Sequence, residues 1–385
     1  MSIEDFVTKM KKIQNDLLEF LEDESDAEGS YINLLKDICA LKLNNSKDEF
    51  QSVMQLINQI SNDHHRTPNF ITKIEQILRD LKKDIGIYFS NSEIYKLFED
   101  NKRIILFFIQ EKIIIVDEYI ASQIINHENK YHRYPEFFAP EIKSFITEEF
   151  IDKYGKERLK IKKDDLIKKI MIDIPIDFNE KRQEGESDDY LCKIIRLDKI
   201  EEFVAYATKT NLNFSSKIHI SIFETNSKLM PQYKDVQIIE YAAFFGSLKI
   251  LKYMYMNGAK FKESIWEYAI HSQNAEFIRF LEENKVSPLN NNFKFPLIHS
   301  IRCHHNDISN YIIENLIPEE KMKEDIENNY YNIYLYCVEF HNYYFFPENL
   351  DYKNMFFYLC IYNNCTLVKL YLQNKNIDIN ARNEI

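Results

Sequence analysis

The sequence predicts an all-α fold, in which an N-terminal helical bundle precedes an irregular array of stacked helix pairs. The 385 residues include only 6 glycines and 9 prolines, too few for the many tight turns of an all-β or α/β chain. Hydrophobic residues make up 45% of the chain and aromatic residues 14%, which is enough for a sizeable core. A helix-pair pattern that recurs in the second half of the chain predicts the array.

The first part of the chain shows helical periodicity throughout. Ser46 and Glu49 form a capping-box pattern at the start of one expected helix. No heptad run is long enough for a coiled coil, so a bundle is the better interpretation. An apolar stripe with helical spacing lies near the N-terminus and consists of Phe6, Met10, Ile13, Leu17 and Leu21.

The expected domain boundary is a charge-rich, weakly periodic stretch. We assign residues 1-150 to an α-helical N-terminal domain, 151-189 to a charged linker or connecting segment, and 190-385 to a repeat domain. Residues 190-209 fit a first helix pair, and residues 211-230 mix β-branched with polar residues as in a long extended loop or hairpin. The clear repeats follow this loop.

Residues 238-259 contain the clearest repeat. Ala242 lies where the first helix must approach its neighbour closely, and Gly246 falls at the tight turn between the helices. Leu248, Leu251 and Met254 give the second helix an apolar face. The unit resembles an ankyrin repeat, which cannot bury its apolar face alone and therefore needs stacked neighbours.

The neighbours of this repeat are present but irregular. Clear repeats are expected near 238-261, 264-288, 295-317 and 355-380, with a weak repeat at 330-350. In the weak repeat an aromatic run before Pro347 gives no clean second helix. The equivalents of Ala242 recur 27, 31, 37 and 22 residues apart, against about 33 for a regular repeat, and are Ala269, Ser300, Cys337 and Leu359.

Several stretches of the chain match one group of proteins. They are residues 192-196, 200-203, 221-227, 240-247, 268-271, 285-286 and 303-308, with residues 133-142 upstream. Residues 187-318 resemble the domain of unknown function that precedes conventional repeats in a large group of protist ankyrin-repeat proteins. The resemblance implies a fold but no chemistry, because that family has no assigned activity and no catalytic residues.

The overall charge and hydropathy limit the classes of partner. A formal net charge of −12 disfavours binding to nucleic acid, which needs a basic surface. No apolar run is long enough to insert into a membrane, and the N-terminus has no secretory signal pattern. The six cysteines are scattered singly, as reduced thiols of a cytosolic protein are. We therefore expect an intracellular, cytoplasmic protein.

Two histidine clusters and one tryptophan are the candidate site residues. Cys303-His304-His305 offers zinc-ligand types but has no partner pair at finger spacing, and His304 falls at the turn position of Gly246, so a structural role is favoured. His64-His65 fits an exposed polar loop. Trp266 fits packing between repeats, with an exposed anchor for a partner as the alternative. We predict no catalytic, cofactor-binding or metal-binding residues.

The predicted function is a non-enzymatic protein-interaction scaffold or adaptor that binds an unidentified protein on a concave face of loops and first helices. One alternative is a regulatory or structural protein, also membrane-peripheral, that acts through its N-terminal domain. A second alternative is an enzyme without a recognisable motif. The last repeat carries apolar groups on more than one side, so we also expect an uncapped array that is truncated or covered by self-association or by a partner.

Overall fold

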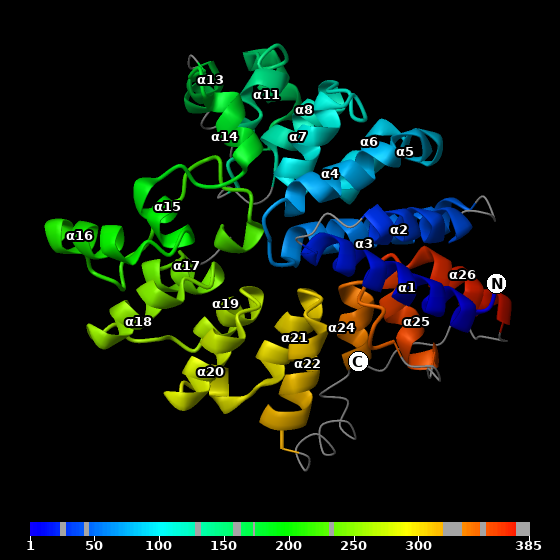
Figure 1. The fold of residues 1–385 in the computed structure, drawn as a ribbon. Coiled ribbons are helices and arrows are strands. Elements are labelled where there is room, and N and C mark those ends of the chain that lie inside the picture. Colours follow the sequence, from blue (N-terminus) through cyan, green and yellow to red (C-terminus); the bar gives the residue numbers. More distant parts are fainter. Residues whose placement is uncertain are drawn as a thin grey trace. The chain divides into compact units, whose positions relative to one another are not determined.

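The computed structural model describes residues 1–23, 28–41, 46–127, 132–156, 163–171, 174–230, 235–318, 333–346 and 352–374. These residues form helices and loops, and their β-type pairing is limited to an isolated antiparallel bridge between Lys217 and Gln237. This confirms the all-α class (Figure 1). The chain divides into two compact units. We call residues 1–80 with 285–385 the terminal unit, and residues 81–284 the central unit.

The terminal unit combines both ends of the chain. Its N-terminal helices are α1 (Ile3–Glu22), α2 (Glu28–Leu41), α3 (Lys47–Asp63) and α4 (Phe70–Asp80). Its C-terminal elements are η4 (Leu289–Asn291), α21 (Lys294–Arg302), α22 (Asn306–Tyr311), the π-helical turn η5 (Ile312–Leu316), α24 (Ile333–Glu339), α25 (Tyr352–Ile361) and α26 (Cys365–Asn374). Ser2 and Ser46 cap α1 and α3, and the predicted apolar stripe of α1 is buried.

The central unit begins with short helices and ends with helix pairs. The first part contains α5 (Lys82–Tyr88), α6 (Asn91–Leu97), α7 (Lys102–Gln110), α8 (Glu118–Ile125), α9 (Tyr134–Phe137), α10 (Ala139–Ile142), α11 (Glu148–Tyr154), α13 (Lys163–Met171) and α14 (Phe178–Glu184). The second part contains α15 (Tyr190–Arg196), α16 (Ile200–Thr210), η3 (Ser227–Leu229), α17 (Ile238–Phe244), α18 (Leu248–Met256), α19 (Ile265–His271) and α20 (Ala275–Glu283). The loop predicted at 211–230 lies between the first two pairs.

The two compact units do not coincide with the domains expected from the sequence. Helices α5 to α10 lie in the predicted N-terminal domain but belong to the central unit. Helices α21 to α26 lie in the predicted repeat domain but belong to the terminal unit. The division into 1-150, 151-189 and 190-385 therefore stays a prediction about where the chain separates under proteolysis.

The helix pairs share one turn, which confirms the predicted register. The turn residue has a positive φ and lies four positions after each equivalent of Ala242, at Gly246, Gln273, His304, His341 and Asn363. Asp198 occupies the same position in the first pair, α15 and α16. In most of these turns the next backbone N–H donates to the carbonyl five residues back, as from Ser247 to Ala242 and from Asn364 to Leu359. Because Asn, Asp and His tolerate positive φ better than most residues, the turn can form without glycine.

Polar side chains next to these turns connect successive repeats. Ser247 Oγ donates to the carbonyl of Ile195 at 2.6 Å, and Asn274 Nδ2 donates to that of Gly246 at 3.3 Å. In the terminal unit Asn342 and Asn364 make equivalent bonds, to Ile301 and Val338 at 2.9 and 3.2 Å. A Ser or Asn one residue after the turn is therefore a sequence signal for stacking, and the sequence analysis did not use it.

The weak repeat has a first helix but no second helix among its described residues. Helix α24 ends in the shared turn at His341, and residues 342–346 continue as a non-helical segment. Tyr343 in this segment is fully buried and packs edge-on against Phe6 of α1 at 6.2 Å. The expected absence of a clean second helix is confirmed for residues 333–346, while Pro347 lies outside the described residues.

The last described helix pair is covered by the N-terminal helices of the same chain. Helix α26 packs on α3 and α1, and Figure 1 shows these C-terminal and N-terminal segments side by side. Ser52 Oγ lies 3.1 Å from Thr366 Oγ1, and Lys369 forms an ion pair with Asp48. The expectation of an uncapped last repeat is therefore wrong. Sequence periodicity could not reveal this cap, because it joins segments more than 300 residues apart.

Candidate functional site

The repeats of the central unit bury their first helices and expose their second helices. Every residue of α17 is buried, and in α19 all but Glu267 are buried. Helices α16, α18 and α20 are amphipathic and keep one face in solvent. The first helices of these two repeats therefore offer little exposed surface, and the expected binding face of loops and first helices stays a prediction.

Aromatic residues gather on the exposed side of the second helices and the loops that follow them. Phe214 lies 6.0 Å from Tyr253, and Tyr255 stacks on Phe261 at 5.0 Å with an interplanar angle of 11°. Met256 follows directly and is 84% exposed. The surface, which we call the outer aromatic face, is formed by Tyr206, Phe214, Tyr253, Tyr255, Phe261 and Phe280, all half-buried, with Met256.

Neighbouring side chains hold Tyr255 and Phe280 in place. Tyr255 and Phe280 meet edge-to-face at 5.5 Å, and Phe280 lies beneath the ammonium of Lys252 at 5.8 Å. Lys252 in turn forms an ion pair with Glu276 at 2.8 Å. Rings fixed in this way lose little conformational entropy when a partner covers their free side.

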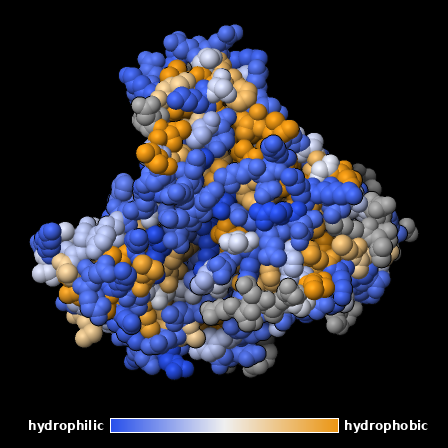
Figure 2. All heavy atoms as spheres, turned by 45° about the horizontal axis from the view of Figure 1, so that its top comes forward, coloured by the Kyte–Doolittle hydropathy of each residue, from blue (hydrophilic) through white to orange (hydrophobic). Residues whose placement is uncertain are grey.

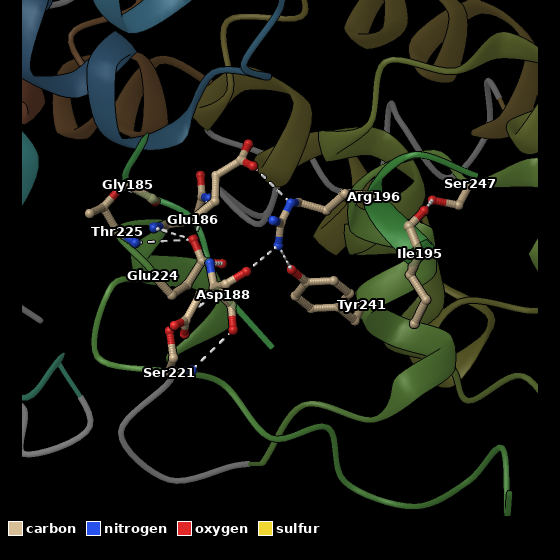
Figure 3. A network of polar contacts seen from close by, with 12 residues as sticks. Gly185, Glu186, Asp188, Ile195, Arg196, Ser221, Glu224, Thr225, Tyr241 and Ser247 are labelled. Carbon is tan, nitrogen blue, oxygen red and sulfur yellow. Dashed lines mark hydrogen bonds and ion pairs between the residues drawn. The ribbon is translucent and has the colours of Figure 1, made fainter. Parts of the chain in front are cut away.

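A buried polar network fixes the start of this repeat stack (Figure 3). The carboxylate of Glu224 is fully buried and accepts hydrogen bonds from the backbone N–H groups of Ser187, Thr225 and Asn226. Thr225 Oγ1 donates to the carbonyl of Gly185 at 2.7 Å. Gly185 has a φ of +70°, and a Cβ there would lie 2.9 Å from Thr225 Oγ1, so only glycine fits without strain.

Arg196 joins the same network to the next repeat. Its guanidinium donates to the carbonyl of Ser187 and to the hydroxyl of Tyr241, both at 2.9 Å, and pairs with Glu186 at 2.8 Å (Figure 3). The stretches that carry the family resemblance at 192-196, 221-227 and 240-247 therefore meet at one place. In this structure they position α15 and α17.

The two predicted histidine clusters come together in the terminal unit. His64 Nδ1 lies 2.7 Å from the carbonyl of Cys303, and the rings of His64 and His305 are 4.7 Å apart. His304 occupies the predicted turn position, and burial lowers its pKa to about 3. Within the described residues these side chains form no group of three with metal-ligand geometry. The predicted structural role fits this packing, but the expected exposed loop at His64 is wrong, because His64 is 1% exposed.

Trp266 is fully buried in α19, at 1% exposure. The predicted packing role is therefore confirmed, and the alternative of an exposed anchor is excluded. All six cysteines are free thiols, and Cys192, Cys303 and Cys337 are buried in the helix pairs.

Comparison with known proteins identifies one ankyrin repeat. The ankyrin-repeat family model matches residues 351–381, a range that contains α25 and α26. No curated protein and no solved structure matches the chain. The chain is thus an all-α helical-repeat protein that contains an ankyrin repeat. No helix of the described residues has both the length and the apolarity needed to cross a membrane.

Proposed function

We propose that the protein is a non-enzymatic scaffold or adaptor that binds a protein partner through the outer aromatic face. The observation that carries the proposal is the row of half-buried rings beside the exposed Met256 on α18. Aromatic residues and methionine are enriched at protein interfaces, where a few of them supply most of the binding energy. Ankyrin repeats act typically as protein-interaction modules, which agrees with this role.

The chemistry around this face favours a protein over nucleic acid. The chain carries a net charge of −12, and acidic side chains such as Glu276 border the rings. Stacking rings alone do not hold nucleic acid without a basic groove. Elsewhere the surface is mostly hydrophilic with separate apolar patches, as Figure 2 shows for one side.

Membership in the protist family with a domain of unknown function is part of the same proposal. Its support is that three of the resembling stretches meet in the network around Glu224 and Arg196. A location in the cytoplasm is also proposed, from the scattered free cysteines.

A substitution at Met256 tests the proposed surface. Met256→Arg places a charge in the outer aromatic face, and because the side chain is 84% exposed the fold should be unaffected. Ile176→Arg is the matched control, since Ile176 is fully exposed in the central unit outside this face. We expect proteins captured by the wild-type chain from native extract, after cross-linking, to be retained by Ile176→Arg and lost with Met256→Arg. Retention of the same proteins by both variants would contradict the proposal.

A specific observation also supports a regulatory or structural role for the N-terminal helices. Helices α1 and α3 cover α26 and therefore occupy a surface on which a further repeat or a partner could otherwise stack. In this second candidate function the N-terminal segment limits access to the end of the array. Gln14→Ala in α1 tests whether the N-terminal helices and the C-terminal repeats unfold together.

A further inference from the structure

The central unit contains a polar cleft of about 780 Å³ that the proposed scaffold function does not use. Its walls come from the segments around α6, α8 and α11 and the loop before α9. Two carboxylates, Glu99 and Asp100, and two imidazoles, His127 and His132, line it. This group of side chains has no recognisable sequence pattern, because the two histidines are five residues apart and Asp100 is distant in sequence.

Three of these side chains are placed like the ligands of a metal ion. One ligand atom each from Asp100, His127 and His132 lies within 4.8 Å of the other two. Asp100 Oδ1 and His127 Nε2 are 3.3 Å apart. A tetrahedral zinc ion with bonds of about 2.0–2.1 Å requires ligand atoms about 3.3 Å apart, so this pair already fits.

The surrounding structure holds the ligands in position. The ring of His127 stacks on Tyr134 with centroids 3.8 Å apart and an interplanar angle of 5°, and His132 lies 5.2 Å from His127. Tyr134 is buried, and its hydroxyl donates to the carbonyl of Glu99 at 2.6 Å, next to Asp100. Supports of this kind orient metal ligands and raise metal affinity.

Positive charge near the cleft comes from Lys102, Lys153 and Lys156. The ammonium of Lys102 donates to the carbonyls of His132 and Ile222, which disperses its charge. Lys153 and Lys156 also line the cleft, and the carboxylates of Glu99 and Asp100 oppose these positive charges.

Tyr95 provides a second, independent indication of a ligand. This residue lines the cleft, its side chain is 1% exposed, and its hydroxyl has no hydrogen-bond partner among the described residues. A buried hydroxyl without a partner costs about 1–3 kcal/mol, so such groups normally serve a bound water, ion or ligand.

We propose that Asp100, His127 and His132 bind a Zn²⁺ ion, with a coordination position left for water or for a group that enters the cleft. Two imidazoles and one carboxylate form a ligand set of borderline softness. Such a set binds zinc in preference to calcium or magnesium. Three protein ligands are also typical of zinc sites that keep an open position.

Metal titration of the untagged full-length chain tests this proposal. After removal of metal with a chelator, we expect one Zn²⁺ to bind per chain by calorimetry, and Co²⁺ to give the visible absorption of a tetrahedral site. Asp100→Asn should weaken Zn²⁺ binding by at least about tenfold and remove the Co²⁺ absorption. The side chain of Asp100 is largely exposed, so this variant should fold, and unchanged circular dichroism checks that it does.

His219→Gln serves as the matched control, because His219 is an exposed histidine of the same unit that lies near a carboxylate, Asp189, at 3.9 Å. It should bind Zn²⁺ like the wild-type chain, and His132→Gln should bind as weakly as Asp100→Asn. The proposal is overturned if the wild-type chain binds no stoichiometric Zn²⁺. It is equally overturned if folded Asp100→Asn binds as tightly as His219→Gln.

Discussion

One buried side chain in the first helix of each pair lies where that helix packs against its neighbours. Ala242 is fully buried, and its equivalents Ala269, Ser300, Cys337 and Leu359 are buried as well. The position thus accepts side chains from alanine to leucine, but the neighbouring residues of each repeat pack to fit the side chain that is present there. Interiors at native packing density tolerate added methyl groups poorly.

Enlarging Ala242 should therefore destabilise the central unit. We expect Ala242→Leu to lower the free energy of unfolding by about 1–3 kcal/mol, because the added methylenes force shifts in α17 and its neighbours. Urea denaturation followed by circular dichroism measures this change. Ala205→Leu is the control, since Ala205 is exposed on α16 and the same enlargement there should have little effect. Equal stability of the two variants would show that Ala242 does not lie between helices.

At the scale of the elements, buried histidines at the turns make the helix pairs of the terminal unit sensitive to acid. Burial lowers the pKa of His304 to about 3 and that of His341 to about 4, and both residues occupy the shared turn position. Burial also lowers the pKa of His65 in the same unit, to about 4. In the unfolded chain these rings titrate near pH 6.5. The unfolded state therefore binds more protons than the folded state below that pH.

The free energy of unfolding should consequently fall as the pH is lowered from about 6.5 towards 4, and the contribution of these histidines should be fully present above about pH 7. His304→Asn removes one titrating ring and keeps a residue type that occupies the same turn in Asn363. We expect the variant to lose stability with acid less steeply, by as much as about 1.4 kcal/mol per pH unit. Urea denaturation at several pH values measures the slope. Identical slopes for variant and wild type would show that His304 does not stay neutral in the folded state.

The sequence was sufficient to predict the elements and their register. The small residue of the first helix and the turn four residues later recur from Ala242 to Leu359, because both are local requirements of one helix pair. Even the weak repeat has both features, at Cys337 and His341. The outer aromatic face could not be predicted, since an apolar residue with helical spacing has the same pattern whether its ring is half-buried or in the core.

At the scale of the whole chain, contacts between segments distant in sequence bury polar residues whose burial the sequence alone could not predict. Gln14 is fully buried in α1, where its Nε2 donates to Asn342 Oδ1 at 3.0 Å and its Oε1 accepts from the backbone N–H of Tyr343 at 2.6 Å. His64 is buried by residues about as far away in sequence, which is why its loop was expected to be exposed. No local pattern encodes such pairs, because a single sequence gives propensities and periodicities only.

The contact of Gln14 predicts that the two ends of the chain unfold together. Gln14→Ala leaves the buried backbone N–H of Tyr343 without its hydrogen-bond acceptor. This change should lower the free energy of unfolding by about 1–3 kcal/mol. We expect faster hydrogen exchange in α1 and also in α24 to α26, because these helices form one cooperative unit. Exchange in α15 to α18 should be unchanged, since these helices belong to the central unit.

Asn15→Ala is the matched control for this experiment, because the neighbouring amide side chain is exposed on the same helix. Its exchange pattern should equal that of the wild-type chain. If Gln14→Ala accelerates exchange in α1 alone, the contact of Gln14 does not couple the N-terminal helices to the C-terminal repeats. Coupled exchange in α24 to α26 would instead show that the N-terminal helices stabilise these repeats.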